Sequence, residues 1–491
     1  MKHHSAPAPE VGKHPLIVDL DGTLIRSDMT HELLVLCARW HPKLLPTAVA
    51  RLLQDRAGAK RWLGSLVGDH IDPAHLPYDP DVIDLINSHK ADGGEVWLVS
   101  GSDHNLVERI ADHLGLFHHA KGSDPGHNLT SSAKATYLKE KLPAGFIYAG
   151  NSRQDFAVWR EASGGFGFRA PSDAYTLRTA AGAPVEVKKV VDRTSMWTPL
   201  RKAMRLHQWA KNILVFVVPG LMLSTLSWTD IWQLLVAFVC FGFMASGTYI
   251  LNDLFDIPDD RKHPTKRNRQ LASGQLSVPD AIVACVVMVI GSLAAAFSLN
   301  SAFGWVLLIY AFATVAYSFR LKRLPIIDVL ILAGLFSLRV WGGAEIMQAP
   351  PSAWLMMFIG LVFLSLAMAK RFVEVRKTAP GKIVAGRGYR REDEPMLLAF
   401  GAASANAAVL ALAVYGLLAP SRLIDNPGVM MIVAAVVGAW FMRIWMVAVR
   451  GELNDDPVLY AVKDKISLAC LALVGGLLAM ESFRPVWSTW F

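Results

Sequence analysis

The chain has 491 residues, of which 53% are hydrophobic and only 18% are charged. This composition excludes an ordinary soluble protein and indicates membrane spans in a chain long enough for two or three domains. The net charge of +8 fits basic loops beside a membrane, and no motif predicts a nucleic-acid partner. The four cysteines are scattered, which excludes a disulfide framework or a zinc site as the organising feature.

The first part of the chain has the pattern of a folded α/β domain. Residues 1–14 are polar and Pro-rich, so we expect them to be disordered and to contain no cleavable signal peptide. Residues 15–170 predict a doubly wound parallel sheet, with a helical cap over residues 30–70 and a linker over 171–198. Three short buried strands are expected at Leu16–Leu20, Val96–Ser100 and Gly145–Gly150.

Residues 199–491 predict an all-α membrane domain, because apolar stretches of membrane-spanning length recur there. Nine spans are expected at 212–227, 231–251, 280–298, 303–318, 325–346, 353–371, 396–418, 429–449 and 466–483. Arg and Lys gather in the loops after the second, fourth, sixth and eighth spans, whereas the other loops contain only Arg422. This asymmetry predicts a multi-pass protein of the cytoplasmic membrane, with the N-terminus and α/β domain in the cytoplasm and the C-terminus on the far side.

Two carboxylates follow the first predicted strand in the sequence Asp-Leu-Asp-Gly-Thr-Leu. Asp19 and Asp21 lie at positions i and i+2, so their side chains point the same way and can share Mg²⁺ or act as nucleophile and acid. Ser100 ends the second strand and can hydrogen-bond a phosphate. Lys134 lies at an expected helix start and can neutralise the phosphate and the nucleophile.

Asn151 and Asp155 follow the third predicted strand and complete a set that resembles the haloacid dehalogenase phosphatases over about 150 residues. The resemblance implies that Asp19 is the nucleophile, which forms an aspartyl-phosphate, and that Asp21 is the general acid and base. The serine and lysine would hold the phosphoryl group. Mg²⁺ would be bound by Asp19, Asp21, Asn151 and Asp155, although many members of that family carry Asp where this chain has Asn151.

An acidic loop, residues 252–269, follows the second predicted span. Asp253, Asp256 and Asp260 have helical i, i+3, i+7 spacing and share one face. Grouped carboxylates repel one another unless a cation joins them, and Mg²⁺ bridging a diphosphate binds carboxylate and phosphate oxygens together. Basic side chains that could hold phosphate oxygens follow in the same loop: Arg261, His263, Lys266, Arg267 and Arg269.

The acidic loop, with Asn252 at its start, resembles the first Asp-rich motif of UbiA-type intramembrane prenyltransferases, and the similarity covers nearly all of residues 200–490. Tyr317, with Lys322 and Arg323, is similar to the loop after their fourth helix. Those enzymes carry a second Asp-rich motif near the end of their sixth helix, where this sequence has three other residues: Lys370, Arg371 and Glu374. Replacement of acid by base suits a donor with an extra phosphate or an acceptor that is itself a phosphate.

The decaprenyl-phosphate phosphoribosyltransferase branch of that superfamily fits this combination of motifs. Arg339 lies inside the fifth predicted span, where a charge is costly and usually faces a site. The segment 205–212, which includes Lys211, is similar to the opening motif of the branch. The resemblance implies phosphoribosyl pyrophosphate as donor, polyprenyl phosphate as acceptor, and Mg²⁺ on Asp253, Asp256 and Asp260 to draw off pyrophosphate.

The expected product would carry a 5-phosphate, which must be removed before the sugar serves as polyprenyl-phosphoryl ribose or arabinose, for example in cell wall arabinan. The fused phosphatase-like domain could remove it. Two alternatives stay open. An aromatic or quinone-pathway prenyltransferase would use a polyprenyl diphosphate, but it predicts the second acidic motif that is missing here. A regulator with an inactive phosphatase domain would not need Asp19 and Asp21. The sequence is compatible with an oligomer.

Overall fold

The computed structural model describes residues 14–124, 128–192, 195–222, 225–349, 351–384, 386–418, 426–453 and 457–487. Arg422 and residues 1–13 of the segment predicted to be disordered lie outside these ranges. The chain forms two compact units: Met1–Ala203 with Ile250–Ala284, and Met204–Tyr249 with Cys285–Phe491. The acidic loop therefore belongs to the same unit as the α/β domain.

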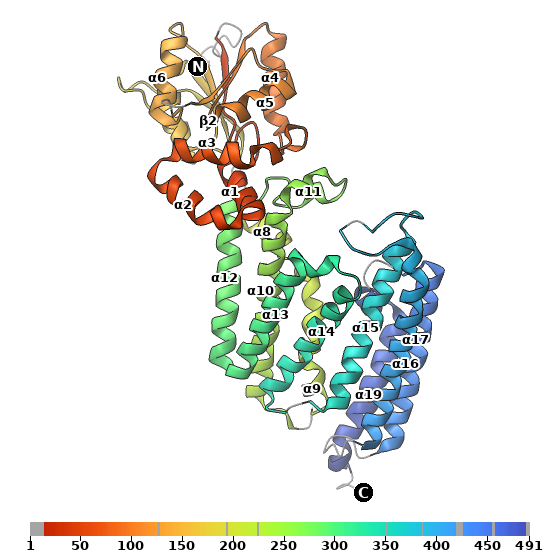
Figure 1. Ribbon diagram of the computed structural model, residues 1–491. Coiled ribbons are helices and arrows are strands. Elements are labelled where there is room, and N and C mark those ends of the chain that lie inside the picture. Colours follow the sequence, from red (N-terminus) through yellow and green to blue (C-terminus); the bar gives the residue numbers. More distant parts are fainter. Residues whose placement is uncertain are drawn as a thin grey trace, which may run out of the picture. The chain divides into compact units, whose positions relative to one another are not determined.

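The first unit contains a six-stranded parallel sheet in the order β3-β2-β1-β4-β5-β6 (Figure 1). Its strands are β1 (Leu16–Val18), β2 (Val96–Asp103), β3 (His119–Ser123), β4 (Ile147–Gly150), β5 (Gly164–Phe168) and β6 (Val187–Val191). The three predicted strands are β1, β2 and β4, and they occupy the centre, since β1 pairs with both of the others. Their carboxyl ends meet at one edge, where a parallel sheet of this kind binds its ligands.

Helices cover both faces of the sheet, with α6 on one side and α4 and α5 on the other (Figure 1). Alternate residues of β1 supply the two cores: Leu16 and Val18 pack beneath α4 and α5, and Ile17 packs beneath α6 and α7. The helices are α1 (Met29–Trp40), α2 (Leu45–Gln54), α3 (Arg56–Val67), α4 (Pro80–Ala91), α5 (His104–Leu114), α6 (Ser131–Lys141) and α7 (Phe156–Glu161). The segment expected to form a helical cap is helical, as α1, α2 and α3.

The predicted linker is wrong over Val187–Val191, because these residues form β6 and pair with β5. Gly165 lies opposite Val187, and Phe166 lies opposite Lys188. Lys188 and Lys189 are exposed on this edge strand, where charged side chains discourage pairing with another chain. The two lysines interrupt the apolar run, so the hydrophobic pattern did not predict this strand.

Seven helices among the described residues are long and apolar enough to cross a membrane. They are α10 (Trp228–Phe255), α12 (Val278–Leu299), α13 (Ser301–Phe319), α14 (Ile327–Ile346), α15 (Ala353–Arg376), α16 (Glu394–Leu418) and α17 (Pro427–Arg450). The shorter helices and the last one are α8 (Trp197–Ala203), α9 (Val217–Gly220), α11 (Ile257–Lys262), α18 (Pro457–Lys463) and α19 (Lys465–Trp487).

Nine spans are therefore not confirmed. The first predicted span forms the 3-10 helix η6 (Leu206–Phe216) and the four-residue α9 instead of one long α-helix. Pro219 and Gly220 explain the interruption, since Pro lacks an amide donor and Gly disfavours helix. The ninth corresponds to α19, whose role as a span stays a prediction, as does the orientation of the chain in the membrane.

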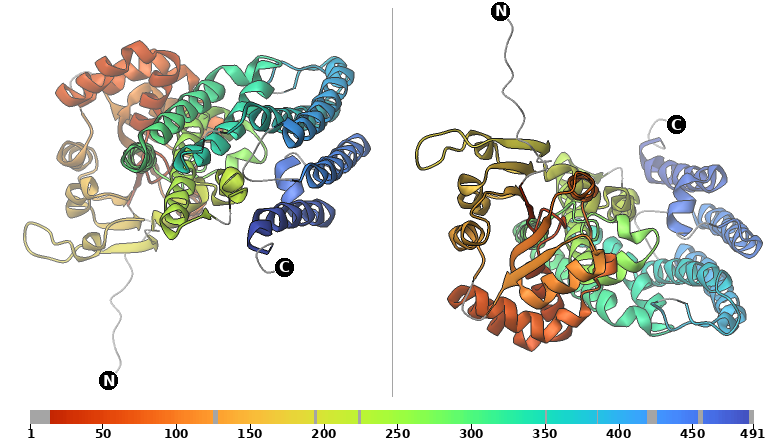
Figure 2. Two further views of the ribbon diagram at one scale, coloured as in Figure 1. Left: turned by 90° about the horizontal axis from the view of Figure 1, so that it is seen from below. Right: turned by 90° about the horizontal axis from the view of Figure 1, so that it is seen from above.

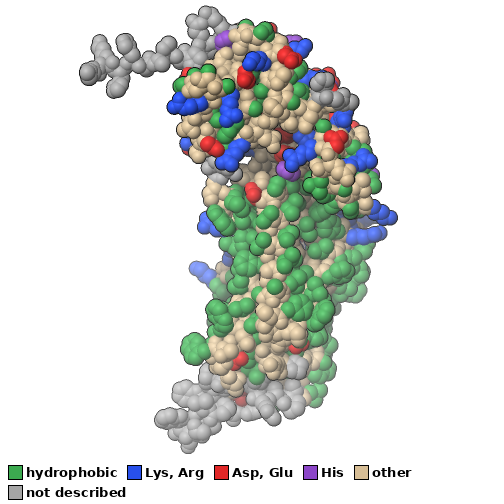
Figure 3. All heavy atoms as spheres, turned by 90° about the vertical axis from the view of Figure 1, so that its left-hand side faces the viewer, with side chains coloured by type: hydrophobic (Ala, Val, Ile, Leu, Met, Phe, Trp, Pro, Cys, Tyr) green, Lys and Arg blue, Asp and Glu red, His purple; other side chains and the backbone are tan. Residues whose placement is uncertain are grey.

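The helices of the second unit run side by side, with α15 packed against both α14 and α16 (Figure 2). Helix α12 shows most clearly how the apolar helices meet their surroundings. Ile282, Val283, Val287 and Ile290 are exposed on it, and hydrophobic side chains gather over the lower part of the face drawn in Figure 3. Exposed apolar surface of this extent is typical of contact with lipid.

Candidate active sites

The first acidic group follows β1 at the edge where β1, β2 and β4 end. Lys134 Nζ donates a hydrogen bond to Asp19 Oδ1 at 2.7 Å, and both side chains are buried. Gly22 turns the chain with φ +74°, and an added Cβ there would lie 2.0 Å from Asn151 Nδ2. The structure thus brings Asp19, Lys134 and Asn151 to one place, as the sequence predicts.

Asp21 lies among hydroxyl and amide donors. Its Oδ2 accepts hydrogen bonds from Ser102 Oγ at 2.5 Å and Ser100 Oγ at 3.3 Å. Its Oδ1 accepts one from the backbone N–H of Met29 at 2.7 Å. The predicted Ser100 is therefore beside Asp21, and Ser102 and the first residue of α1 are added to the site.

Asp155 fixes the turn that follows β4. Its Oδ2 accepts hydrogen bonds from Asn151 N at 3.0 Å, Ser152 N at 2.8 Å and Ser152 Oγ at 3.0 Å. Its Oδ1 accepts one from the Tyr148 hydroxyl at 2.6 Å, and that hydroxyl accepts one from Lys134 at 3.0 Å. A carboxylate has about four acceptor positions, so these donors fill Asp155. This geometry assigns Asp155 to the turn and does not support direct Mg²⁺ ligation.

Burial shapes the protonation of this site. It raises the pKa of Asp19 to about 7, against the lowering effect of the Lys134 ammonium. Burial also raises the pKa of Asp21, and the Asp28 carboxylate adds to the rise. Burial alone would lower the pKa of Lys134, but the Asp19 carboxylate raises it overall. Lys134 thus keeps its charge beside Asp19, and burial shifts both aspartates toward the protonated form.

The acidic loop begins where α10 ends and α11 starts. Arg269 Nη1 donates hydrogen bonds to Asp253 Oδ1 at 3.1 Å and to Asp260 Oδ2 at 2.8 Å. Asn252 Nδ2 donates one to Asp256 Oδ2 at 2.7 Å. Burial raises the pKa of Asp260, opposed by Arg269 and reinforced by the Asp253 and Asp256 carboxylates. The three predicted acids therefore act on one another around a guanidinium group.

The acidic loop contains carboxylates that could bind a hard cation, but they do not form a complete coordination sphere. Among the described residues, no group of three or more His, Cys, Asp or Glu side chains surrounds one metal position. Asp253 and Asp260 nevertheless share Arg269, and the Asp256 carboxylate lies near enough to raise the pKa of Asp260. Carboxylate oxygens are the ligands that Mg²⁺ takes together with substrate phosphates. These aspartates thus offer oxygen ligands of the kind that Mg²⁺ takes, and phosphate and water would have to complete the coordination.

The basic residues of the loop divide into two groups. Arg261 forms a bidentate ion pair with Glu32 on α1, at 2.8 and 2.7 Å, and both side chains are buried. This pairing does not support the predicted contact between Arg261 and phosphate. His263, Lys266 and Arg267 are exposed, so these three can meet an anionic ligand from solvent.

Arg371 lies in a buried polar network of the second unit. Its Nε donates a hydrogen bond to Asp328 Oδ2 at 2.5 Å, and its Nη1 pairs with Glu374. The Tyr317 hydroxyl accepts from Arg371 at 3.2 Å, and the Tyr389 hydroxyl donates to Asp328 Oδ1 at 2.6 Å. Arg371 is only 1% exposed, so this cation is neutralised inside the fold.

Arg339 is a buried cation with neutral partners. Its guanidinium donates hydrogen bonds to Asn212 Oδ1 at 2.9 Å, Leu335 O at 2.6 Å and the Tyr310 hydroxyl at 2.8 Å. It also lies 4.8 Å from the Tyr310 ring centroid and 5.4 Å from that of Phe336. Among the residues that the structure describes, the hydrogen-bond partners of Arg339 are all uncharged, so this buried cation suits an anionic ligand.

The remaining predicted residues of the second unit lie near helix ends or rings. Lys211 Nζ lies 5.9 Å from the Phe336 ring centroid. Lys322 and Arg323 belong to the 3-10 helix η9 (Leu321–Arg323) after α13. Lys370 lies directly before Arg371 in α15 and is half-buried.

Comparisons with known proteins decide the family. A model of the UbiA prenyltransferase family matches residues 213–477, which is more than half of the chain. The chain belongs to the UbiA prenyltransferase family. A haloacid dehalogenase-like hydrolase model matches residues 16–160. This UbiA protein therefore carries a haloacid dehalogenase-like domain in the same chain.

Relatives extend the comparison. An uncharacterized protein of Sinorhizobium fredii is 37% identical over 95% of this chain and 91% of its own length, so the match extends across both parts. Nodulation protein NoeC of Azorhizobium caulinodans is 32% identical over 58% of this chain and 93% of its own. Decaprenyl-phosphate phosphoribosyltransferase of Mycobacterium tuberculosis is 29% identical over 57% of this chain and 93% of its own.

Several residues of this UbiA protein were missed by sequence reasoning. Ser102 lies two residues after Ser100 on β2, so its alternation with Ser100 was the available signal. Tyr148 resembled an ordinary core residue of an apolar strand. Asp328 gave no signal, since an acid in the first turn of a helix is a common favourable placement, and its partner Arg371 is 43 residues away.

Proposed function

We propose that this UbiA-family protein transfers 5-phosphoribose from phosphoribosyl pyrophosphate to a polyprenyl phosphate, and that its haloacid dehalogenase-like domain then removes the 5-phosphate. The observation that carries the proposal is the acidic loop, in which Asp253, Asp256 and Asp260 act on one another around Arg269. The similarity to a protein named decaprenyl-phosphate phosphoribosyltransferase supports the choice of donor and acceptor.

The transfer step exchanges one bond at C1 of the ribose. The C1–O bond to pyrophosphate breaks, pyrophosphate leaves with the electron pair, and an oxygen of the lipid phosphate forms the new C1–O bond. Asp253, Asp256 and Asp260 would hold Mg²⁺, which offsets the charge that develops on the leaving group. Arg339 supports this chemistry, because its buried charge has only neutral hydrogen-bond partners among the described residues and suits a phosphate.

The second step is hydrolysis of the 5-phosphate ester. Asp19 would attack phosphorus while the C5 oxygen leaves with a proton from Asp21, and water would then hydrolyse the aspartyl-phosphate. The raised pKa of Asp21 supports its role as the proton donor. Lys134, which bonds Asp19 at 2.7 Å, would neutralise the phosphoryl oxygens. We also propose a cytoplasmic location for this domain, because Arg and Lys gather in the loops on its side of the predicted spans.

Product analysis tests the proposal. Purified protein in detergent or liposomes is incubated with Mg²⁺, phosphoribosyl pyrophosphate and polyprenyl phosphate, and the lipid fraction is examined by mass spectrometry. We expect polyprenyl-phosphoryl-5-phosphoribose and its dephosphorylated form. Geranyl diphosphate with 4-hydroxybenzoate is the parallel assay for an aromatic prenyltransferase. Product in that assay and none from phosphoribosyl pyrophosphate would overturn the proposal.

A further inference from the structure

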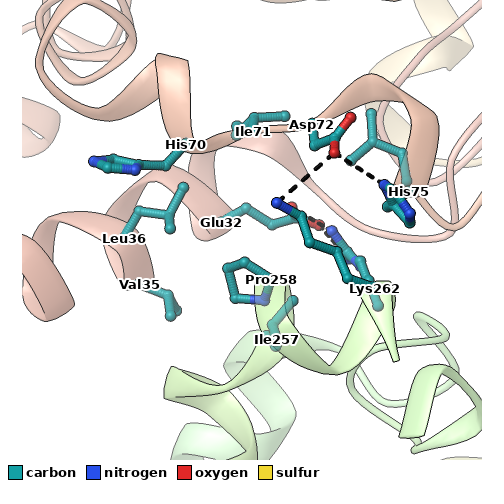
Figure 4. Close-up of a pocket in the computed structure, with 12 residues that line it drawn as sticks. Glu32, Val35, Leu36, His70, Ile71, Asp72, His75, Ile257, Pro258 and Lys262 are labelled. Atoms are coloured by element: carbon teal, nitrogen blue, oxygen red, sulfur yellow. Dashed lines mark hydrogen bonds and ion pairs between the residues drawn. The ribbon is translucent and has the colours of Figure 1, made fainter. Parts of the chain in front are cut away.

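The acidic loop packs against helix α1 and segment 70–76 of the phosphatase-like domain, within one compact unit. Residues of α1 and of segment 70–76 line one side of the contact, and residues of α11 line the other (Figure 4). The gap left between them has a volume of about 20 Å³, little more than one water molecule needs. The two surfaces are therefore closely packed.

A buried ion pair holds the part of the acidic loop that follows Asp260. Glu32 on α1 bonds both Nη atoms of Arg261, and the two side chains are 6% and 7% exposed. Arg261 Nε also donates to the backbone carbonyl of Ala272 at 3.0 Å. Arg261 directly follows Asp260, so Glu32 fixes the position of the residue next to a predicted Mg²⁺ ligand. A planar, bidentate pair of this kind fixes orientation as well as distance.

A second charged residue of α1, Arg39, holds the beginning of the same segment. Arg39 Nη1 donates to the carbonyl oxygen of Phe255 at 2.7 Å, and its Nη2 bonds Asp259 Oδ2 at 2.7 Å. Phe255 is the last residue of α10, where carbonyls lack partners within the helix. Asp256 lies between α10 and α11. Arg39 therefore bonds residues on both sides of Asp256.

We infer that α1 of the phosphatase-like domain is a positioning element of the transferase, with Glu32 and Arg39 as its positioning residues. The inference rests on the proposed role of the acidic loop and deepens it. The same helix begins at Met29, whose N–H bonds Asp21 at 2.7 Å. One helix thus contacts the acid of one site at its start and aligns the acids of the other through its later residues.

Hydrogen exchange and turnover together test the inference. Glu32→Arg opposes Arg261 with a like charge, and the double variant Glu32→Arg with Arg261→Glu restores an opposite pair. We expect faster amide exchange in residues 257–262 and a transfer rate about tenfold to a hundredfold lower in the single variant, as for a misplaced active-site group. The double variant should recover most of the slow amide exchange and most of the transfer rate. Glu108→Arg, at an exposed position of α5, is the matched control.

Several outcomes decide the inference. Unchanged exchange in Glu32→Arg would show that α1 does not hold α11. Faster exchange with unchanged transfer would show that the contact has no positioning role. If Glu32→Arg fails to fold, the same exchange and transfer measurements are made on Arg39→Gln, which keeps the pair between Glu32 and Arg261. If the protein transfers from an isoprenoid diphosphate instead, the proposed function fails. The positioning role of α1 is then tested by comparing amide exchange and transfer from that donor between the variants and the unaltered protein.

Discussion

The two acidic sites of the protein differ in how their carboxylates are held. In the phosphatase-like domain, Asp19 and Asp21 lie on a strand end, and each hydrogen bond comes from a neighbouring element of the same α/β fold. In the acidic loop, Asp253 and Asp260 share Arg269, and the flanking residues are held by the cap helix α1. A sheet edge preorganises the first site, whereas the acids of the second lie in a loop whose flanking residues are held by α1.

The largest expected effect comes from removal of the phosphatase nucleophile. Asp19→Asn keeps the shape of the side chain but cannot form an aspartyl-phosphate, so phosphate release should fall by roughly four orders of magnitude or more. Transfer should continue, because the acidic loop is intact. The measurement is the ratio of 5-phosphorylated to dephosphorylated lipid by mass spectrometry. Loss of transfer in a folded variant would mean that the two sites share a reaction step.

The next largest effect is expected in the acidic loop. Asp256→Asn removes one of three carboxylates from the predicted Mg²⁺ site, and we expect transfer to fall about a hundredfold or more. Phosphate release from a small phosphate ester should not change. Asp280→Asn, a carboxylate that bonds Ser277 at the start of α12, controls for charge loss nearby. Normal transfer by a folded Asp256→Asn protein would remove the loop from the mechanism.

Two adjacent cations of α15 should respond differently. Arg371→Ala leaves Asp328 buried without its cation, so the free energy of unfolding should fall by ~3–5 kcal/mol, measured by thermal or denaturant unfolding in detergent. Lys370→Ala should leave stability almost unchanged. It should raise the donor's KM or lower kcat about tenfold, which corresponds to ~1.4 kcal/mol. Lys377→Ala, at an exposed position beyond α15, is the control. Equal stability losses for Lys370 and Arg371 would contradict this distinction.

The smallest effect is expected at Tyr148, whose hydroxyl joins Lys134 to Asp155. Tyr148→Phe removes one buried hydrogen-bonded group, so we expect a stability loss of about 1–2 kcal/mol and a phosphatase rate lower by less than tenfold. The readouts are the melting temperature and hydrolysis of a small phosphate ester. A rate loss as large as that of Asp19→Asn would instead place Tyr148 in the chemistry.

Much of the fold follows from local sequence. The central strands β1, β2 and β4 are apolar runs that end in polar turns, and the long apolar helices exceed the length of a buried core helix. Strands β5 and β6 were missed because β5 is rich in Gly and β6 carries two lysines. Local pattern also could not show that Pro219 and Gly220 would divide the first predicted span.

The sites show where sequence reasoning stops. The spacing of Asp253, Asp256 and Asp260 is a local property, and the structure brings these residues together. Spacing cannot show whether Asp155 faces a ligand or caps its own turn. Nor can it show that Arg261 pairs with Glu32, which is 229 residues away. Long-range pairing of charges is set by the assembled fold, and it decides which cations stay free for a substrate.

The most direct test of the two-step account uses phosphoribosyl pyrophosphate labelled at its 5-phosphate. Purified protein is given this donor with polyprenyl phosphate, and the label is followed over time in the lipid and water phases. We predict that the label enters the lipid first and then appears as inorganic phosphate, with the ribose retained on the lipid. In the Asp19→Asn variant the label should stay in the lipid. No label in the lipid at any time, in either protein, would contradict the account.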